Sequence, residues 1–150
     1  MNGLKRILYA EDDVKDIELT LSALDEYKLA NEVVIVNDGE EALEYLYYKG
    51  KFADREKGNP AVVFLDIKMP KITGLEVLKQ IKSDSNLRLI PTVLLTSSKE
   101  EKDYLTGYQL GANAYVVKPV DFGDFINTVK ELGLFWAVIN EPPPNSVKKR

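Results

Sequence analysis

The sequence contains neither cysteine nor histidine among its 150 residues. Without cysteine the protein cannot form disulfides, thiolate metal sites or a cysteine nucleophile. Without histidine it lacks the commonest general base and zinc ligand. Any chemistry must therefore depend on carboxylates, lysine, hydroxyl groups and a cation that prefers oxygen ligands.

A strong excess of one charge and a long apolar run are also missing. The 20 basic and 24 acidic residues leave a net charge of -4, which gives no general attraction to nucleic acid or to an anionic membrane. No apolar run approaches the roughly 18 residues of a membrane span, and the amino terminus lacks a signal-peptide pattern. We expect a cytoplasmic protein that binds neither nucleic acid nor a membrane.

Short apolar runs alternate five times with segments of helical periodicity. This alternation is typical of an α/β domain in which helices cover both faces of a parallel sheet. The predicted strands lie near 5–10, 32–36, 61–66, 91–96 and 114–117, and the predicted helices near 14–28, 39–48, 74–83, 99–110 and 121–139.

The length fits one domain. We expect it to cover residues 1–140, with an extended carboxyl-terminal helix region. Residues 141–150 contain three consecutive prolines and three basic residues, which predict a flexible tail. Residues 48–60 have no clear apolar period and are expected to form an exposed loop.

Polar side chains follow four of the predicted strands at the point where each strand ends. They are Asp12, Asp66, Thr96 and Lys118. The carboxyl ends of parallel strands share one edge of the sheet, where open α/β sheets place their ligand sites. Each residue alone could cap a helix or face water, but the set of four favours a shared site.

Acidic residues are concentrated after the first strand, at Glu11, Asp12 and Asp13. Clustered carboxylates repel one another, which raises a pKa or recruits a cation. Mg²⁺ suits such a cluster because it prefers oxygen ligands and often uses one or two carboxylates together with a phosphate oxygen. The sequence therefore predicts a magnesium site close to Asp66.

Several short motifs, in this order and at this spacing, resemble the receiver domain of two-component response regulators over about residues 5 to 135. They are Glu11-Asp12, Leu65-Asp66 followed by Met69-Pro70 and Gly74, Thr96-Ser97, and Lys118-Pro119. The resemblance implies a flavodoxin-like (βα)5 fold with strand order 2-1-3-4-5. It also implies that Asp66 accepts a phosphoryl group from a phosphohistidine of a sensor histidine kinase. A chain without histidine cannot be that donor itself.

The same resemblance assigns roles to further residues. Glu11, Asp12, Asp66 and the backbone carbonyl of Lys68 would hold Mg²⁺.

Thr96, Ser97 and Lys118 would contact the phosphoryl group, and a cis bond would join Lys118 to Pro119. Thr96 and Tyr115 would form a conformational switch that changes the surface of the fourth helix, fifth strand and fifth helix. The protein would then be a signalling phosphoacceptor with slow self-dephosphorylation rather than a turnover enzyme.

The carboxyl-terminal region carries more apolar side chains than one buried helix face needs. After Gly133, apolar residues point in nearly every direction, and we expect a homodimer that uses Phe125, Phe135, Trp136 and Ile139. This extension and the long loop at 48–60 resemble stand-alone receivers that accompany bacterial phytochrome kinases. That narrower resemblance implies a phytochrome-type kinase as partner.

Three alternatives compete with this interpretation. A phosphatase of the haloacid dehalogenase type needs a second acid two residues after the nucleophile, where this chain has Lys68. In a flavin- or nucleotide-binding module, the acids at 11–13 would repel the phosphate. A receiver-like adaptor that acts by protein contact and never takes phosphate stays open.

Overall fold

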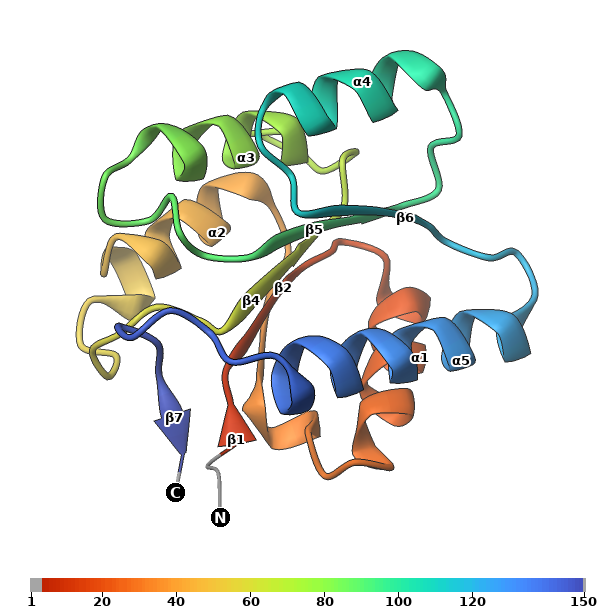
Figure 1. Cartoon of the computed structure of the whole chain (residues 1–150), viewed down its shortest axis with the longest axis horizontal. Helices are drawn as coiled ribbons and strands as arrows, with labels where there is room; N and C mark the ends of the chain where they lie inside the picture. The colour runs from red at the N-terminus through yellow and green to blue at the C-terminus, as the bar shows by residue number, and fades with distance from the viewer. Residues whose placement is uncertain (1–3, 150) are drawn as a thin grey trace.

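The computed structural model describes residues 4–149 (Figure 1). Its centre is a parallel sheet of five strands in the order β3-β2-β4-β5-β6. The bounds are β2 Ile7–Ala10, β3 Val33–Val36, β4 Val62–Leu65, β5 Thr92–Thr96 and β6 Ala114–Val117. Counted in chain order, the five predicted strands have the order 2-1-3-4-5, which confirms the expected fold.

Helices cover both faces of this sheet, as predicted (Figure 1). Helices α1 (Val14–Asp25) and α5 (Phe122–Gly133) lie on one face. The other face is covered by α2 (Gly39–Leu46), α3 (Gly74–Ser83) and α4 (Glu101–Gln109). Two short 3-10 helices occupy Ala30–Glu32 and Gly50–Phe52. No helix between residues 4 and 149 is long and apolar enough to cross a membrane.

Short polar side chains begin four of the helices. Asp13, Asp38, Thr73 and Asp121 each accept a hydrogen bond from the backbone N–H three residues later, at the start of α1, α2, α3 and α5. Such caps satisfy amides that have no partner inside the helix. They fix the point at which each helix leaves the edge of the sheet.

The central strands are buried on both faces, which explains their unbroken apolar runs. Ile7, Tyr9 and Phe64 face α1 and α5, whereas Leu8 and Leu65 face the opposite layer. All five are fully buried. A polar residue directly after such a strand is therefore the first one that can reach solvent at the edge.

Helix α3 begins against the backbone of Asp66. A Cβ atom on Gly74 would lie 2.0 Å from the carbonyl oxygen of Asp66, so only glycine fits there. The N–H of Gly74 also donates to the carbonyl of Ile67 over 2.9 Å. This close approach holds the loop after β4 in place.

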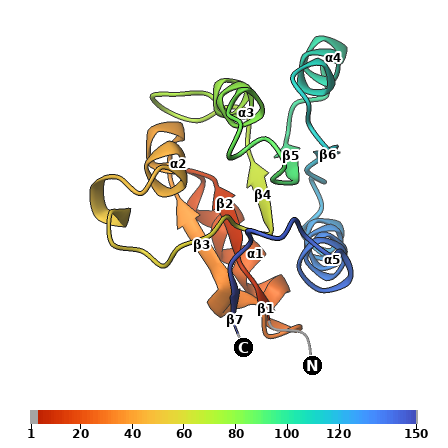
Figure 2. The same cartoon turned by 60° about the vertical axis from the view of Figure 1, so that its left-hand side comes forward.

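The carboxyl-terminal region differs from the prediction in two ways. Helix α5 ends at Gly133, and Leu134–Ile139 continue as a π-helix, so the predicted helix over 121–139 changes its winding. Beyond it the expected free tail folds back: β7 (Lys148–Lys149) pairs antiparallel with β1 (Leu4–Lys5), beside the two termini (Figure 2). Val147 is buried, and apolar burial of this kind explains why the tail packs.

Lys5 joins the amino terminus to the π-helix. Its buried ammonium donates to the carbonyls of Val138, at 3.4 Å, and Asn140, at 2.5 Å. A cation at the end of a helix offsets the partial negative charge of its free carbonyls. The chain between α5 and the tail is therefore fixed by a long-range contact.

Candidate functional site

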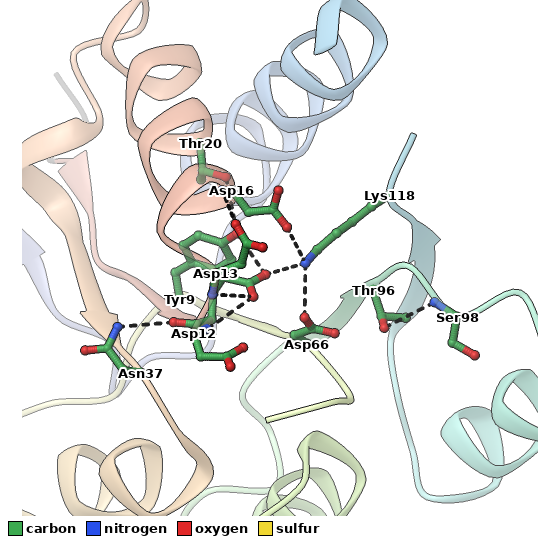
Figure 3. Close-up of polar contacts among 11 residues, drawn as sticks. Tyr9, Asp12, Asp13, Asp16, Thr20, Asn37, Asp66, Thr96, Ser98 and Lys118 are labelled. Atoms are coloured by element: carbon green, nitrogen blue, oxygen red, sulfur yellow. Dashed lines mark hydrogen bonds and ion pairs between the residues drawn. The ribbon is translucent and has the colours of Figure 1, made fainter. Parts of the chain in front are cut away.

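The polar residues after the central strands meet at one edge of the sheet (Figure 3). Asp66 follows β4 directly, and its N–H donates to the carbonyl of Ala10 over 3.2 Å. Lys118 follows β6 in the same way and donates its N–H to the carbonyl of Thr96 over 2.8 Å. The sheet register thus continues through both residues and fixes where their side chains emerge.

Three acidic side chains form a potential metal centre at this edge. Glu11, Asp12 and Asp66 each offer a carboxylate oxygen, and these oxygens lie within 4.8 Å of one another. Asp12 is exposed, whereas Glu11 and Asp66 are buried. The Oδ1 atom of Asp66 is buried and has no hydrogen-bond partner within residues 4–149. A buried oxygen without a partner is unfavourable unless a cation or a ligand meets it, so these residues fit a divalent cation of the Mg²⁺ type.

The ammonium of Lys118 lies among three carboxylates. It pairs with Asp66 Oδ2 at 3.0 Å, with Asp16 Oδ2 at 2.9 Å, and with Glu11 Oε1 (Figure 3). Its side chain is only 7% exposed. Charged hydrogen bonds in such a buried place are stronger than exposed ones. One lysine therefore connects β2, α1 and β4 at the site.

Burial and the neighbouring charges together shift the pKa values of Lys118 and Glu11. Burial lowers the pKa of Lys118, but the charge of Asp66 and the hydrogen bonds to Glu11 and Asp16 outweigh it, so the net pKa lies above the usual range. Burial raises the pKa of Glu11 to about 7, although its hydrogen bond to Lys118 opposes this. Three carboxylates against one ammonium leave the cluster net negative, which favours a divalent cation.

Sequence reasoning missed Asp16. This residue lies in the first turn of α1, one helical turn after Asp12, and its side chain reaches Lys118. The available signal was an acid in the first turn of a helix that starts at the same edge of the sheet. Acids are common there because they complement the helix dipole, so the position alone does not indicate that Asp16 also pairs with Lys118.

The hydroxyl residues after β5 are divided between two environments. Thr96 is buried, and its Oγ1 accepts from the N–H of Ser98 at 3.4 Å. Ser97 is exposed, whereas Ser98 is buried and donates to Asp103 over 2.5 Å. In Figure 3 Asp66 lies between Asp12, which follows β2, and Thr96 at the end of β5, in agreement with the strand order.

Tyr115 on β6 is half-buried at the α4 side of the sheet. Its hydroxyl donates to the carbonyl of Ser98 over 3.1 Å, and its ring meets Tyr104 of α4 edge-on at 4.6 Å. Lys68, two residues after Asp66, has an exposed side chain. Tyr115 therefore connects the loop after β5 with α4.

The expected cis bond between Lys118 and Pro119 needs correction. This bond is trans, since the described part of the chain contains no cis peptide bond. The trans form is the favoured one before proline, and Lys118 reaches the acids with it.

Phe125, expected at a dimer interface, is only 3% exposed and packs in the core between α5 and the sheet. It belongs to the regular buried stripe of α5, which the core of one chain uses entirely. Phe135 and Ile139 are exposed by 47% and 63%, and Trp136 is half-buried against the core.

Similar proteins of known family support the interpretation of this edge of the sheet as a receiver site. Residues 7–130 match the model of the response regulator receiver domain. The chain belongs to the response regulator receiver family. With that family shown, the phosphatase and nucleotide-binding alternatives lose their support.

Three relatives are informative. Response regulator Rcp1 from Synechocystis sp. (strain ATCC 27184 / PCC 6803 / Kazusa) is 33% identical over 135 residues, which covers 90% of each chain. The structure of its Mn²⁺-bound form has a TM-score of 0.86 at 32% identity, with 93% of this chain and 99% of that one covered. The phosphorylated cyanobacterial phytochrome response regulator RcpA has a TM-score of 0.86 at 37% identity, with 93% and 98% covered. The bacteriophytochrome response regulator RtBRR is 59% identical with a TM-score of 0.74, with 95% and 86% covered.

Proposed function

We propose that this protein is a stand-alone response regulator whose Asp66 accepts a phosphoryl group from a sensor histidine kinase. The observation that carries the proposal is the state of the Asp66 carboxylate. Oδ2 is paired with Lys118, and Oδ1 is buried without a partner among the described residues. One carboxylate oxygen of Asp66 lies within 4.8 Å of carboxylate oxygens of Glu11 and Asp12. Such a carboxylate is positioned for both a cation and an acceptor reaction.

In the proposed reaction, a carboxylate oxygen of Asp66 attacks the phosphorus of the donor's phosphohistidine. The new P–O bond forms as the P–N bond breaks, and the histidine nitrogen of the kinase keeps the electron pair. Glu11, Asp12, Asp66 and the backbone carbonyl of Lys68 would hold Mg²⁺, which when bound offsets the charge of the phosphoryl oxygens. Slow attack of water on the phosphorus would break the P–O bond to Asp66, release inorganic phosphate and restore the carboxylate.

Lys118 has to change partners in this reaction. Before it, the ammonium is shared by three carboxylates. After it, the ammonium pairs with a phosphoryl oxygen, because that group brings about 1.5 to 2 negative charges to Asp66. Lys118 therefore acts as a phosphate clamp and not as a base, since its pKa is raised.

We propose that Thr96 and Tyr115 transmit the phosphorylated state. In the phosphorylated protein the hydroxyl of Thr96 would turn to donate a hydrogen bond to a phosphoryl oxygen. In the unphosphorylated structure this hydroxyl accepts from the N–H of Ser98. The carbonyl of the same Ser98 holds the hydroxyl of Tyr115. A displaced Ser98 would release Tyr115 and change the surface of α4, β6 and α5, provided that the phosphate favours one of the two states.

Labelling with a small phosphate donor tests the acceptor. We expect the protein incubated with acetyl phosphate and Mg²⁺ to gain the mass of one phosphoryl group, measured by intact mass spectrometry. Asp66→Asn should gain none, because an amide is not a nucleophile for this step. EDTA should suppress the gain in the unsubstituted protein.

The matched control is Asp54→Asn, which removes an exposed acid of the 48–60 loop. It should label like the unsubstituted protein. A gain that persists in Asp66→Asn would place the nucleophile elsewhere. No gain in the unsubstituted protein would favour the adaptor that acts by protein contact alone.

We further propose a cytoplasmic protein whose kinase is of the phytochrome type and which forms a homodimer. Two of the similar structures are phytochrome response regulators, RcpA and RtBRR, and the similarity to each extends over more than nine tenths of this chain. The exposed apolar side chains of the π-helix supply a surface for a second copy.

Sedimentation measures the proposed dimer. We expect the protein to sediment as a dimer and the double variant Phe135→Asp, Ile139→Asp as a monomer, because two buried charges would oppose the interface. Val120→Asp is the control, since Val120 is 88% exposed outside the π-helix. An unsubstituted protein that stays monomeric at every concentration would contradict the dimer.

A further inference from the structure

Tyr9 is a buried tyrosine in the middle of an apolar strand. It lies on β2 with no exposed surface, and its ring meets Phe64 of β4 edge-on at 6.5 Å. Apolar packing alone would be served as well by phenylalanine. A buried hydroxyl is unfavourable unless it has hydrogen-bond partners, so the position of this one needs a reason.

The hydroxyl of Tyr9 connects α1 with the acidic cluster. It accepts from Thr20 Oγ1 of α1 over 3.2 Å and donates toward Glu11 Oε1 at 3.4 Å (Figure 3). Thr20 is fully buried as well. Burial also raises the pKa of Tyr9 above its usual range, so the hydroxyl remains protonated and can donate to Glu11.

The carboxylate of Glu11 is held from two sides. Its Oε2 accepts from the N–H groups of Asp12 and Asp13, each at 3.2 Å. Its Oε1 is shared by Lys118 and Tyr9. Without the tyrosine hydroxyl, Lys118 alone would determine where Oε1 points. The contact to Tyr9 is longer than a typical O–H···O bond, so we expect its loss to have only a small effect on cation affinity.

Helix α1 thus supports the site at two points one turn apart. Asp16 contacts Lys118 directly, and Thr20 reaches Glu11 through Tyr9. Groups that hold a metal ligand from behind fix its orientation and are needed for full affinity. We propose that Tyr9, held by Thr20, is a positioning residue that orients Glu11 for divalent-cation binding beside Asp66; this rests on the metal site of the proposed function.

Calorimetric titration with MgCl₂ tests the positioning role without any reaction. We expect Tyr9→Phe to raise the dissociation constant about tenfold, the small end for an outer-shell partner of a metal ligand. Thr20→Val should raise it less, because Tyr9 keeps its own hydroxyl, and Thr20→Ser should recover the affinity lost in Thr20→Val. Tyr45→Phe is the matched control, a buried tyrosine on the opposite face of the sheet.

Labelling by acetyl phosphate at a series of Mg²⁺ concentrations gives a second readout. Tyr9→Phe should raise the Mg²⁺ concentration for half-maximal rate by the same factor and leave the rate at saturating Mg²⁺ unchanged. A general loss of structure would lower both affinity and maximal rate, and would lower the melting temperature too.

An unchanged dissociation constant in Tyr9→Phe would overturn the inference while leaving Asp66 as the acceptor. Equal losses in Tyr9→Phe and Tyr45→Phe would also overturn it, because the effect would then not depend on the site. An unsubstituted protein that binds no Mg²⁺ would overturn the inference together with the proposed metal site. Should Tyr9→Phe fail to fold, the comparison of Thr20→Val with Thr20→Ser decides by the same titration.

Discussion

Lys118→Met is expected to lower the free energy of unfolding of the metal-free protein by about 3 kcal/mol, the low end for breaking a buried ion pair. The ammonium lies against Glu11, Asp16 and Asp66, and two of these acids are buried. Methionine fills a similar volume, so the main change is the loss of the charge. Without a compensating cation the acids repel one another, which lowers the free energy of unfolding. Protonation of one acid would relieve part of this repulsion.

Magnesium should reverse much of this loss. A divalent cation binds the folded state and supplies the positive charge that Lys118 no longer gives. We therefore expect the stabilisation by Mg²⁺ to be larger in Lys118→Met than in the unsubstituted protein. Urea denaturation near pH 7.5, with EDTA and with MgCl₂, measures both quantities.

Lys68→Met is the control for this experiment. Lys68 lies two residues after Asp66 but is exposed, so its loss should change the free energy of unfolding little. Equal stability of Lys118→Met and the unsubstituted protein in EDTA would show that the three ion pairs contribute nothing net. A smaller Mg²⁺ effect in Lys118→Met would contradict the shared role of lysine and cation.

The sheet and its polar edge could be predicted because both follow from local patterns. Runs such as 62–65 are apolar throughout, since both faces of a central strand are buried. The first polar residue after each run must then lie at the edge, which applies to Asp66 and Lys118. The strand order was inferred from resemblance, because periodicity does not determine which strands pair.

Contacts between distant segments could not be predicted in this way. Arg55 lies between the rings of Tyr45 and Tyr48, at 3.9 Å and 4.0 Å, and anchors the loop that composition alone describes as exposed. The pairing of β7 with β1 joins the two ends of the chain. Such contacts depend on the folded arrangement, and no short window of sequence contains both partners.

The site itself shows the same division. Tyr9 looks like one more apolar member of its strand, and only the structure reveals that its hydroxyl faces Glu11. Phe125 and Phe135 look alike in the sequence, yet the first is core and the second is exposed. Phe125 lies within α5, whereas Phe135 lies in the π-helix after Gly133, where Ala137 remains in the core and Phe135 faces outward.

The absence of histidine makes one pH dependence unusually easy to assign. Burial raises the pKa of Glu11 from its ordinary value of 4.5 to about 7. An acid with a raised pKa in the folded state holds its proton more tightly there than in the unfolded chain. The metal-free protein is therefore expected to lose stability as the pH rises from about 4.5 to about 7. The slope for one proton is at most about 1.4 kcal/mol per pH unit.

Glu11→Gln should remove most of this slope between pH 5.5 and 7.5, because no histidine titrates in that range. Urea denaturation in EDTA at several pH values measures it. Since a cation binds the ionised carboxylate, the stabilisation by Mg²⁺ should instead grow as the pH rises. A slope that survives in Glu11→Gln would assign the titration to another group. A free energy of unfolding that rises with pH in EDTA would contradict the raised pKa of Glu11 in the folded protein. It would also contradict the inference that this cluster needs a cation.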